Sequence, residues 1–404
     1  MARFHDVLIV GGGHGGAQTA IALRQNGFAG SIAIIGDEPE PPYERPPLSK
    51  EYLAGDKTFE RLHLRPEAFW RDRAIDLVLG ARVDFLDPTL KQVVTTGGER
   101  FGYGALVWAT GGRPRRLDCE GGDLAGVHAI RTRADVDLLR SELPAARRVV
   151  IIGGGYIGLE AAAVLRKFDK SVTLIEAQHR LLARVAGPTL SRFYEAEHRD
   201  RGVDVRLAST VSRLVGAEGR VNGVVLASGE RLAADLVIVG IGVAPAVEVL
   251  RQAGALGTNG VLVDDRCRTS LADVFAIGDC AARKSRFSPT AVRIESVPNA
   301  NEQALTVACE LTGRERDHDA PPWFWSNQFD LRLLTVGLSD GFDVEVVRGD
   351  PATKSFSVVY LREGRIIALD CVNAAKDFAR GKSLVANGVL TTPGLIADVN
   401  IPLP

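Results

Sequence analysis

The chain has 404 residues, which is more than one hydrophobic core usually supports, so we expect two or three domains. Its composition is that of an ordinary globular protein, with 46% hydrophobic and 25% charged residues. The 49 basic and 50 acidic residues nearly cancel, so the net charge supports neither nucleic-acid binding nor general attraction to a membrane, and is compatible with a local basic patch for a small acidic partner.

The apolar stretch near the N-terminus is short and runs directly into glycines, which argues against a signal peptide. No run of about 18 apolar residues predicts a transmembrane helix. The five cysteines are scattered and form no CxxC pair, so they predict neither a disulfide framework nor a zinc site nor a redox dithiol. We therefore expect no metal site and a reducing, cytoplasmic location.

The first predicted element is a βαβ unit over residues 6–35, in which a glycine-rich turn joins an apolar strand to an alanine-rich helix. Gly11, Gly13 and Gly16 form a GxGxxG pattern in this turn. The first glycine permits the tight turn, the second lets the backbone approach a pyrophosphate, and the third allows close helix–strand packing. A phosphate would then lie at the positive end of the helix.

A predicted strand at 105–109 also ends in a glycine turn, and residues 148–175 then repeat the βαβ pattern. Gly153, Gly155 and Gly158 form the second GxGxxG turn. Because two such units occur in one chain, we predict two dinucleotide sites and hydride transfer between a resident flavin and an exchanging nicotinamide.

Glu176 follows the last strand of the second unit, where a carboxylate accepts hydrogen bonds from the adenosine ribose and repels a 2′-phosphate. This favours NADH over NADPH, and the neighbouring Arg180 and Arg184 weaken that preference. An exposed charge at a strand end is the alternative interpretation of Glu176. In the first unit the corresponding acid is Asp37.

A further strand at 235–239 again precedes a glycine turn, so we expect the chain to leave the first domain near residue 111 and return near residue 242. The predicted FAD-binding domain is therefore discontinuous, comprising 1–111 and 242–317. The NAD-binding domain, 112–241, is inserted within it.

Residues 318–404 differ in character, because short strands separated by turns precede a helical segment at 374–388. We predict a C-terminal α+β interface domain here. The fold class is thus α/β, with two Rossmann-like, glutathione-reductase-like dinucleotide-binding domains and a third domain after them.

Several motifs together carry a resemblance to a known family: PPLSK at 46–50, ATGGRPR at 109–115, VVIIGGGYIGLE at 149–160, AIGDCA at 276–281, VRIESVPNA at 292–300 and PWFWS at 322–326. Over essentially its whole length the chain resembles the FAD-dependent, NADH-linked ferredoxin reductases of bacterial oxygenase systems. VRIESVPNA and PWFWS discriminate best, because the glycine motifs are shared by all two-dinucleotide flavoproteins.

The resemblance implies two sets of cofactor contacts. Those implied for FAD are Gly11, Gly13, Gly15, Gly16, Asp37, Arg45, Lys50, Val83, Ala109, Arg131, Asp279, Val297 and Trp325. Those implied for NADH are Gly153, Gly155, Ile157, Gly158, Glu176, Arg184 and Gly242.

The resemblance also implies that Lys50 and Glu160 pair across the nicotinamide pocket and act in catalysis. From the residues alone, Lys50 could equally be a solvated loop lysine, and Glu160 could simply stabilise the start of its helix. Trp323 and Trp325 alternate along a predicted strand and should share one face, which core packing also explains.

The implied reaction is hydride transfer from NADH to FAD, followed by single-electron transfer to a [2Fe–2S] ferredoxin that supplies a ring-hydroxylating or haem-thiolate oxygenase. Arg283, Lys284 and Arg286 form a basic cluster that would steer an acidic ferredoxin, or is an ordinary solvated cluster. A thiol mechanism is not expected, because the first cysteine is Cys119 and Cys280 reads as a packing residue.

Two alternatives stay open at this point. The same enzyme could use another acceptor, such as rubredoxin, a small quinone or a radical. A flavoprotein with a binding or signalling role, resembling apoptosis-inducing factor, is the more distant reading. We expect a monomer or a weak homodimer.

Overall fold

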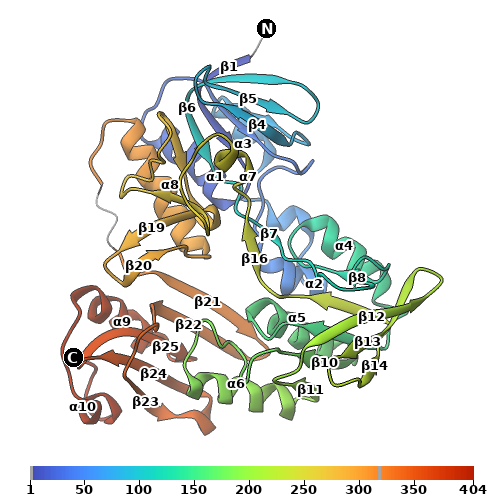
Figure 1. The fold of residues 1–404 in the computed structure, drawn as a ribbon. Helices are drawn as coiled ribbons and strands as arrows, with labels where there is room; N and C mark the ends of the chain where they lie inside the picture. Colours follow the sequence, from blue (N-terminus) through green and yellow to red (C-terminus); the bar gives the residue numbers. More distant parts are fainter. Residues whose placement is uncertain (1–2, 317–319) are drawn as a thin grey trace. The chain divides into compact units, whose positions relative to one another are not determined.

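The computed structural model describes residues 3–316 and 320–404 and divides the chain into two units, each made of three separate stretches. Unit 1 comprises Met1–Arg45, Phe59–Arg113 and Ala244–Pro322, and unit 2 comprises Pro46–Thr58, Pro114–Val243 and Trp323–Pro404 (Figure 1). Two features differ from the sequence-based division. The short stretch Pro46–Thr58 lies in unit 2, and the regions expected to form the NAD-binding and C-terminal domains cluster together. The boundary expected at 317/318 lies outside the described residues.

Unit 1 is built around a sheet of strand order β3-β2-β1-β6-β5-β4, in which β18 also pairs with β6. The strands are β1 (Arg3–Val10), β2 (Ile32–Ile35), β3 (Ile75–Val78), β4 (Val83–Asp87), β5 (Gln92–Thr95), β6 (Arg100–Trp108) and β18 (Val274–Ala276). β1, β2, β3, β6 and β18 run parallel, whereas β4 and β5 pair antiparallel.

β1 shows why this sheet is buried on both faces. Val7 and Ile9 enter the core on the side of α1 (His14–Gln25) and α8 (Val297–Leu311), and Leu8 and Val10 enter a second core on the other side. A strand whose alternate residues are all apolar is typical of a parallel sheet covered on both faces. The remaining elements of unit 1 are η2 (Phe59–Leu62), α3 (Glu67–Asp72), α7 (Glu248–Gln252), β17 (Val261–Val263), η3 (Gly278–Cys280), β19 (Ala281–Ser285) and β20 (Ser288–Val292).

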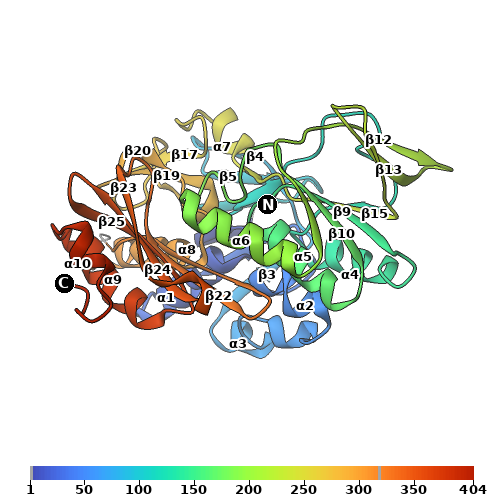
Figure 2. The same ribbon diagram turned by 90° about the horizontal axis from the view of Figure 1, so that it is seen from below.

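Unit 2 contains a five-stranded parallel sheet of order β11-β10-β9-β15-β8. Its strands are β8 (Val127–His128), β9 (Arg148–Ile152), β10 (Ser171–Ile175), β11 (Val203–Arg206) and β15 (Leu236–Val239). The helices are α4 (Arg133–Glu142), α5 (Tyr156–Lys167) and α6 (Pro188–Asp200). Figure 2 shows α5 beside β9 and β10, the arrangement of a βαβ crossover. An antiparallel sheet of β12 (Val211–Ala217), β13 (Arg220–Leu226) and β14 (Arg231–Ala233) covers part of this core.

The C-terminal part of unit 2 is an antiparallel sheet of order β21-β22-β25-β24-β23. Its strands are β21 (Trp323–Gln328), β22 (Leu331–Gly337), β23 (Val344–Asp350), β24 (Ser355–Arg362) and β25 (Arg365–Val372). Helices α9 (Ala375–Asn387) and α10 (Pro393–Ala397) pack against it, and η4 (Pro351–Thr353) joins β23 to β24. The predicted fold class, two Rossmann-like regions and an α+β region, is confirmed.

The short elements η1 (Pro46–Ser49) and α2 (Glu51–Ala54) form the first stretch of unit 2, and β7 (Gly112–Pro114) and β16 (Val243–Pro245) lie at two crossings between the units. Within residues 3–316 and 320–404, no helix is both long and apolar enough to cross a membrane.

Candidate active site

The first glycine turn lies in unit 1 between β1 and α1. Gly11 has a φ of +116°, and a Cβ there would lie 2.4 Å from the carbonyl oxygen of Ala109. A Cβ on Gly16 would lie 2.0 Å from the carbonyl oxygen of Gly11, so both positions require glycine. Gly13 is the N-cap of α1 and, having no side chain, makes no capping hydrogen bond to the helix. Nothing lies within 4 Å of the position that its Cβ would take. The turn therefore places backbone N–H groups at the helix N-terminus, which fits a pyrophosphate.

The second glycine turn, between β9 and α5 in unit 2, repeats this construction. Gly153 has a φ of +113°, and its Cβ would lie 2.3 Å from the carbonyl oxygen of Gly240. A Cβ on Gly158 would meet the carbonyl oxygen of Gly153 at 2.1 Å. Gly155 is again an uncapped N-cap facing open space, and Ile157 is 38% exposed in the first turn of α5. A second dinucleotide pyrophosphate fits here.

Glu176 lies at the carboxyl end of β10, against this second turn. Its Oε2 accepts the N–H of Gly154 at 2.7 Å, and its Oε1 accepts the N–H of Gln178 at 2.8 Å. These bonds orient the carboxylate beside the glycine turn, where a ribose bound to the turn would meet it. An unconstrained charge at a strand end would not show this geometry.

The two nearby arginines behave differently. Arg180 is used within the loop, since its Nη1 donates to the carbonyl oxygen of Ala186 at 2.5 Å and to Ser191 Oγ at 2.9 Å. Arg184 is exposed, and its guanidinium lies beside Gly242, whose φ is +98°. Of the two, only Arg184 is therefore placed to meet a ligand.

Asp37, the acid expected in the first unit, lies one position beyond the residue equivalent to Glu176. In both units the first glycine of the turn donates its N–H to the last residue of the second strand, at 2.7 Å to Ile35 and 2.8 Å to Ile175. By this equivalence, Gly36 and not Asp37 occupies the position in unit 1 that Glu176 occupies in unit 2. Asp37 is exposed one position later.

Glu38 is an acidic residue that the sequence interpretation missed. Its Oε1 accepts from Arg45 Nη2 at 2.5 Å, and its Oε2 accepts from Tyr43 Oη at 2.5 Å. Arg45 also lies over the Tyr43 ring, 5.2 Å from its centroid. The predicted FAD contact Arg45 is thus held in a fixed orientation by Glu38 and Tyr43.

Asp279 and Val297 lie on η3 and at the start of α8. The N–H of Gly278 donates to Gln303 Oε1 at 2.7 Å, and Arg293 Nη1 donates to the carbonyl oxygen of Asp279 at 3.0 Å, so this loop is fixed on both sides. Ser296 Oγ caps α8, which begins at Val297. The structure thereby places Asp279 and a helix N-terminus within one short region of unit 1.

For two other residues predicted to contact FAD, Val83 and Arg131, the structure gives a position but no feature that points to a cofactor. Val83 is 7% exposed and packs in the core, so its side chain is a core side chain. Arg131 lies in unit 2, directly before Thr132, the N-cap of α4.

Cys280 follows Asp279 and is fully buried. Its Sγ donates to the carbonyl oxygen of Ile277 at 3.0 Å, and burial raises the pKa of the thiol to about 11. A protonated, inaccessible thiol does not act as a redox nucleophile. None of the five cysteines is bonded to another.

Lys50 and Glu160, the pair that the resemblance implies for the nicotinamide pocket, form a buried ion pair in unit 2. Lys50 Nζ lies 2.7 Å from Glu160 Oε2, and the two side chains are only 11% and 4% exposed. Both residues belong to unit 2, because η1 carries the PPLSK segment against α5. The pairing rules out the solvated loop lysine as the description of Lys50.

Two serines missed by the sequence interpretation complete the surroundings of Glu160. Ser49 Oγ donates to Glu160 Oε2 at 2.5 Å, and Ser326 Oγ donates to Glu160 Oε1 at 2.6 Å. Ser326 lies in the PWFWS motif, where alternation along β21 directs Phe324 and Ser326 towards α5. That alternation was the signal available in the sequence.

The two tryptophans of the motif share the opposite face of β21. Their ring centroids are 5.7 Å apart, and Trp323 also contacts Phe378 of α9 and the Nζ of Lys382. The shared face predicted from the alternation is therefore present in the structure, and Trp325 remains half-buried.

Comparison with known proteins places these features in a family. The pyridine nucleotide-disulphide oxidoreductase model matches residues 5–304, and the reductase C-terminal model matches residues 323–404. A ferredoxin–NAD(P)+ reductase from a Sphingomonas species is 60% identical over 401 residues, covering 99% of this chain and 97% of the relative. The ferredoxin reductase subunit of 5,5′-dehydrodivanillate O-demethylase from a Sphingobium species is 57% identical over 400 residues, covering 98% and 97%. Among solved structures, the covalent putidaredoxin reductase–putidaredoxin complex aligns with a TM-score of 0.96 at 40% identity, covering 98% of this chain and 97% of that chain.

Proposed function

This chain belongs to the pyridine nucleotide-disulphide oxidoreductase family, and we propose that it is an FAD-dependent reductase that takes a hydride from NADH and passes electrons singly to a [2Fe–2S] ferredoxin serving an oxygenase. The observation that carries the proposal is the pair of glycine turns, built alike and each open at a helix N-terminus. Two dinucleotides in one chain suit hydride transfer from one cofactor to the other.

FAD fits the first turn. Gly11, Gly13 and Gly16 would hold its pyrophosphate, and Asp279 and the N-terminus of α8 would hold the remainder of the chain leading to the ring. When bound, FAD accepts a hydride and gives up electrons one at a time, which is chemistry that no side chain here can supply. The residues named bind and orient the cofactor.

The second turn would bind NADH, and Glu176 would select it over NADPH. Its carboxylate is fixed by two backbone N–H groups, so it cannot swing away from a 2′-phosphate without losing both bonds. The exposed Arg184 would contact the dinucleotide from the other side of the turn and limits the strictness of this preference.

Lys50 would be the cation that faces the reacting rings, and Glu160 would hold it in place. A buried ammonium requires a partner, and Glu160 supplies one at 2.7 Å. The pair would therefore keep a fixed positive charge in a site from which water is largely excluded, where a charge acts most strongly.

A disulfide-reducing activity does not fit the chain, although some members of the family reduce disulfides. The five cysteines are unpaired, and burial raises the pKa of Cys267 to about 12 and that of Cys371 to about 12. Thiols so strongly protonated are poor nucleophiles. The unpaired cysteines are consistent with a cytoplasmic location, where NADH is available, and cell fractionation would test it.

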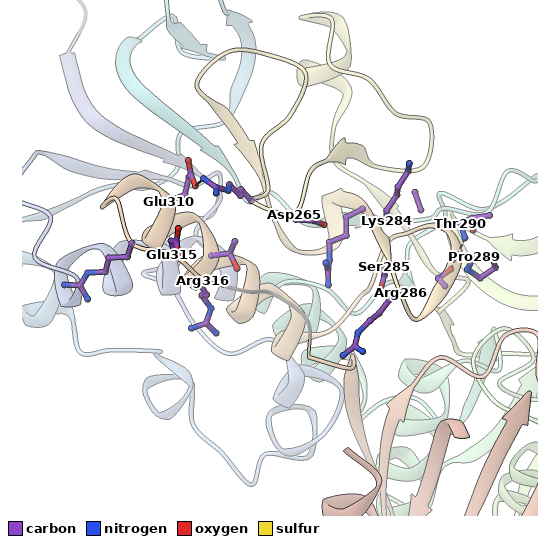
Figure 3. Close-up of a pocket in the computed structure, with 15 residues that line it drawn as sticks. Asp265, Lys284, Ser285, Arg286, Pro289, Thr290, Glu310, Glu315 and Arg316 are labelled. Carbon is purple, nitrogen blue, oxygen red and sulfur yellow. Dashed lines mark hydrogen bonds and ion pairs between the residues drawn. The ribbon is translucent and has the colours of Figure 1, made fainter. Parts of the chain in front are cut away.

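A basic groove in unit 1 is the proposed contact for the acidic ferredoxin. The groove measures about 900 Å³. The cationic residues lining it are Arg266, Arg283, Lys284, Arg286, Arg314 and Arg316, and the acidic residues are Asp265, Glu310 and Glu315. In Figure 3, Lys284 and Arg286 extend from the β19–β20 hairpin, and Glu310 lies on α8. Arg266 pairs with Glu310 at 3.0 Å, so part of the acidic lining is already neutralised.

The groove is built from elements that also carry proposed FAD contacts. β19 directly follows η3, which contains Asp279, and α8 begins at Val297. An acidic protein attracted to the groove would meet the β19–β20 hairpin, whose first strand directly follows Asp279 and Cys280, and long-range attraction would raise the rate of encounter.

The test is NADH-driven reduction of cytochrome c by the FAD-loaded protein, with and without a [2Fe–2S] ferredoxin from an oxygenase system. We expect strong stimulation by the ferredoxin, with NADPH a much poorer donor. If NADH reduces the flavin but the ferredoxin does not stimulate cytochrome c reduction, the assignment of ferredoxin as acceptor is wrong, and the assignment of FAD and NADH as cofactors is kept. Failure of NADH to reduce the flavin would overturn the proposal as a whole.

A further inference from the structure

Glu160 is connected to a second buried group through a chain of side chains. Gln328 Nε2 lies 3.2 Å from Ser326 Oγ, and Gln328 Oε1 lies 2.9 Å from His198 Nε2. Ser326, Gln328 and His198 are 0%, 1% and 0% exposed. A continuous buried path of hydrogen bonds thus runs from α6 through β21 to Glu160 on α5, entirely within unit 2.

The direction of every bond in this path follows from the carboxylate. An ionised Glu160 can only accept, so Ser326 must donate its hydroxyl proton to it. The free lone pair of Ser326 then accepts from the amide nitrogen of Gln328, which turns the amide oxygen towards His198. His198 must therefore carry its proton on Nε2.

His198 is suited to this role because it is neutral. Burial lowers its pKa to about 4, with Arg201 adding to the shift and Gln328 and Glu197 opposing it. Its Nδ1 has no hydrogen-bond partner among residues 3–316 and 320–404, as expected for the unprotonated nitrogen. The single ring proton points into the path towards Glu160.

We propose that His198, Gln328 and Ser326 form a polarised relay that holds Glu160 ionised and so positions the Lys50 ammonium. All donors in the relay point towards the carboxylate, and each bond strengthens the next. A buried histidine that served only packing could either donate to or accept from its hydrogen-bond partner. Here His198, Gln328 and Ser326 each donate in the direction of Glu160, which is the direction that an anion requires. Gln328 and Ser326 are positioning residues that act through Glu160, and the inference rests on the proposed function of the Lys50–Glu160 pair.

Substitutions in the relay should change the electrostatic surroundings of Glu160 more than the packing around it. Glu160 faces Lys50 and Ser49 from η1 and its C-terminal edge, Tyr156 from its own helix, and Tyr194 from α6. The tyrosines also interact with the buried Asp370 of β25. With Ser326 unable to donate, Glu160 Oε1 loses this hydrogen bond, whereas Ser49 and Lys50 still donate to Oε2.

Two variants test the relay. Ser326→Ala deletes the donor, and Gln328→Glu keeps the shape of the side chain but replaces the amide donor with an acceptor, so that Ser326 turns away from Glu160. The matched control is Ser357→Ala, because Ser357 is equally buried in the same sheet and also donates to a carboxylate, Asp377 Oδ2 at 2.9 Å. No hydrogen bond joins Ser357 to the relay in the part of the chain the structure describes.

For both relay variants we expect the limiting rate of flavin reduction by NADH, measured by stopped flow, to fall roughly ten- to hundredfold, the range for one lost bond to a charged group. The Kd for NADH should change little, and the fall in rate on the acid side should move to higher pH. The control should match the parent protein in all three. A fall in rate that is equal in the control and the relay variants, or an unshifted pH profile in both relay variants, would overturn the relay.

A readout independent of turnover is the Nε2 proton signal of His198 in protein labelled with ¹⁵N-histidine. Ser326→Ala should shift this signal although Ser326 does not touch His198, and Ser357→Ala should not. An unchanged His198 signal in Ser326→Ala would overturn the coupling even if the rate falls. If the parent protein itself is not reduced by NADH, the proposed function fails instead, and the His198 signal still reports on the relay.

Discussion

Glu160→Gln tests the buried ion pair directly, because the amide keeps the shape of the side chain and removes its charge. The pair is separated by 2.7 Å with both side chains almost fully buried. At an effective dielectric constant of about 20, two unit charges at this distance attract by about 6 kcal/mol, most of which offsets the cost of burying them. Removing one partner of such a pair leaves an uncompensated charge and costs about 3–5 kcal/mol.

The cost should appear in the unfolding of unit 2. A loss of about 3 kcal/mol in a region of this size lowers the Tm by roughly 6–12 °C. Lys50→Met should destabilise by a similar amount, because it leaves the carboxylate unpaired. The double variant Lys50→Met/Glu160→Gln carries no charge at these two positions and should recover about 2 kcal/mol relative to either single variant.

Calorimetry or circular dichroism on the four proteins completes this double-mutant cycle. Additive effects, each below about 0.5 kcal/mol, would refute the reasoning, because that is the behaviour of an exposed ion pair. In the FAD-loaded protein, Glu160→Gln should also slow flavin reduction by NADH, whereas reduction by dithionite should be unaffected.

Three further predictions address cofactor choice, acceptor docking and pH. Glu176→Ala should raise the KM for NADH by about tenfold and narrow the preference over NADPH, since a charge-assisted contact is lost; unchanged kinetics with both donors would contradict the assignment. Charge reversal at Arg286 or at Lys284, which both line the basic groove, should raise the ferredoxin KM roughly three- to tenfold and leave ferricyanide reduction unchanged. Unaltered ferredoxin kinetics in both variants would contradict the proposed docking surface. Burial raises the pKa of Asp370 to about 7 from 3.8, with Glu345 adding to the shift. Because the folded protein therefore holds a proton that the unfolded chain releases, stability should fall as the pH rises from about 4 to about 7, and Asp370→Asn should flatten that part of a Tm-against-pH curve.

The glycine turns could be predicted from the sequence because their constraints are local. Gly11 and Gly153 need positive φ angles, and Gly16 and Gly158 need to lack a Cβ, and both requirements leave a direct mark in the sequence. The expected insertion of a second dinucleotide-binding domain also rests on a local signal, the strand–glycine turns that flank it, and its boundaries stay a prediction.

What the sequence could not predict depends on contacts between distant segments or on the last residue of a strand. Ser326 reaches Glu160 across 166 residues of chain, and only the packing of β21 on α5 brings them together. The position of Asp37 relative to the end of β2 depends on the hydrogen bond there, and strand ends are uncertain by a residue or more in a sequence, so the contact of Asp37 with FAD stays a prediction. The residue at the end of that strand is a glycine, so no charge marked the equivalent of Glu176.

The placement of Pro46–Thr58 has a consequence for attempts to recombine this protein with its relatives. These residues are flanked on both sides by stretches of unit 1, yet they supply the lysine whose counter-ion lies on α5. In a chimera that exchanges only Pro114–Val243, Lys50 would come from one parent and its counter-ion Glu160 from the other. Exchange of nicotinamide specificity should therefore succeed only when the PPLSK stretch and strand β21, which bears Ser326, are exchanged together with Pro114–Val243. The three stretches are far apart in the gene, yet they have to be inherited from one parent.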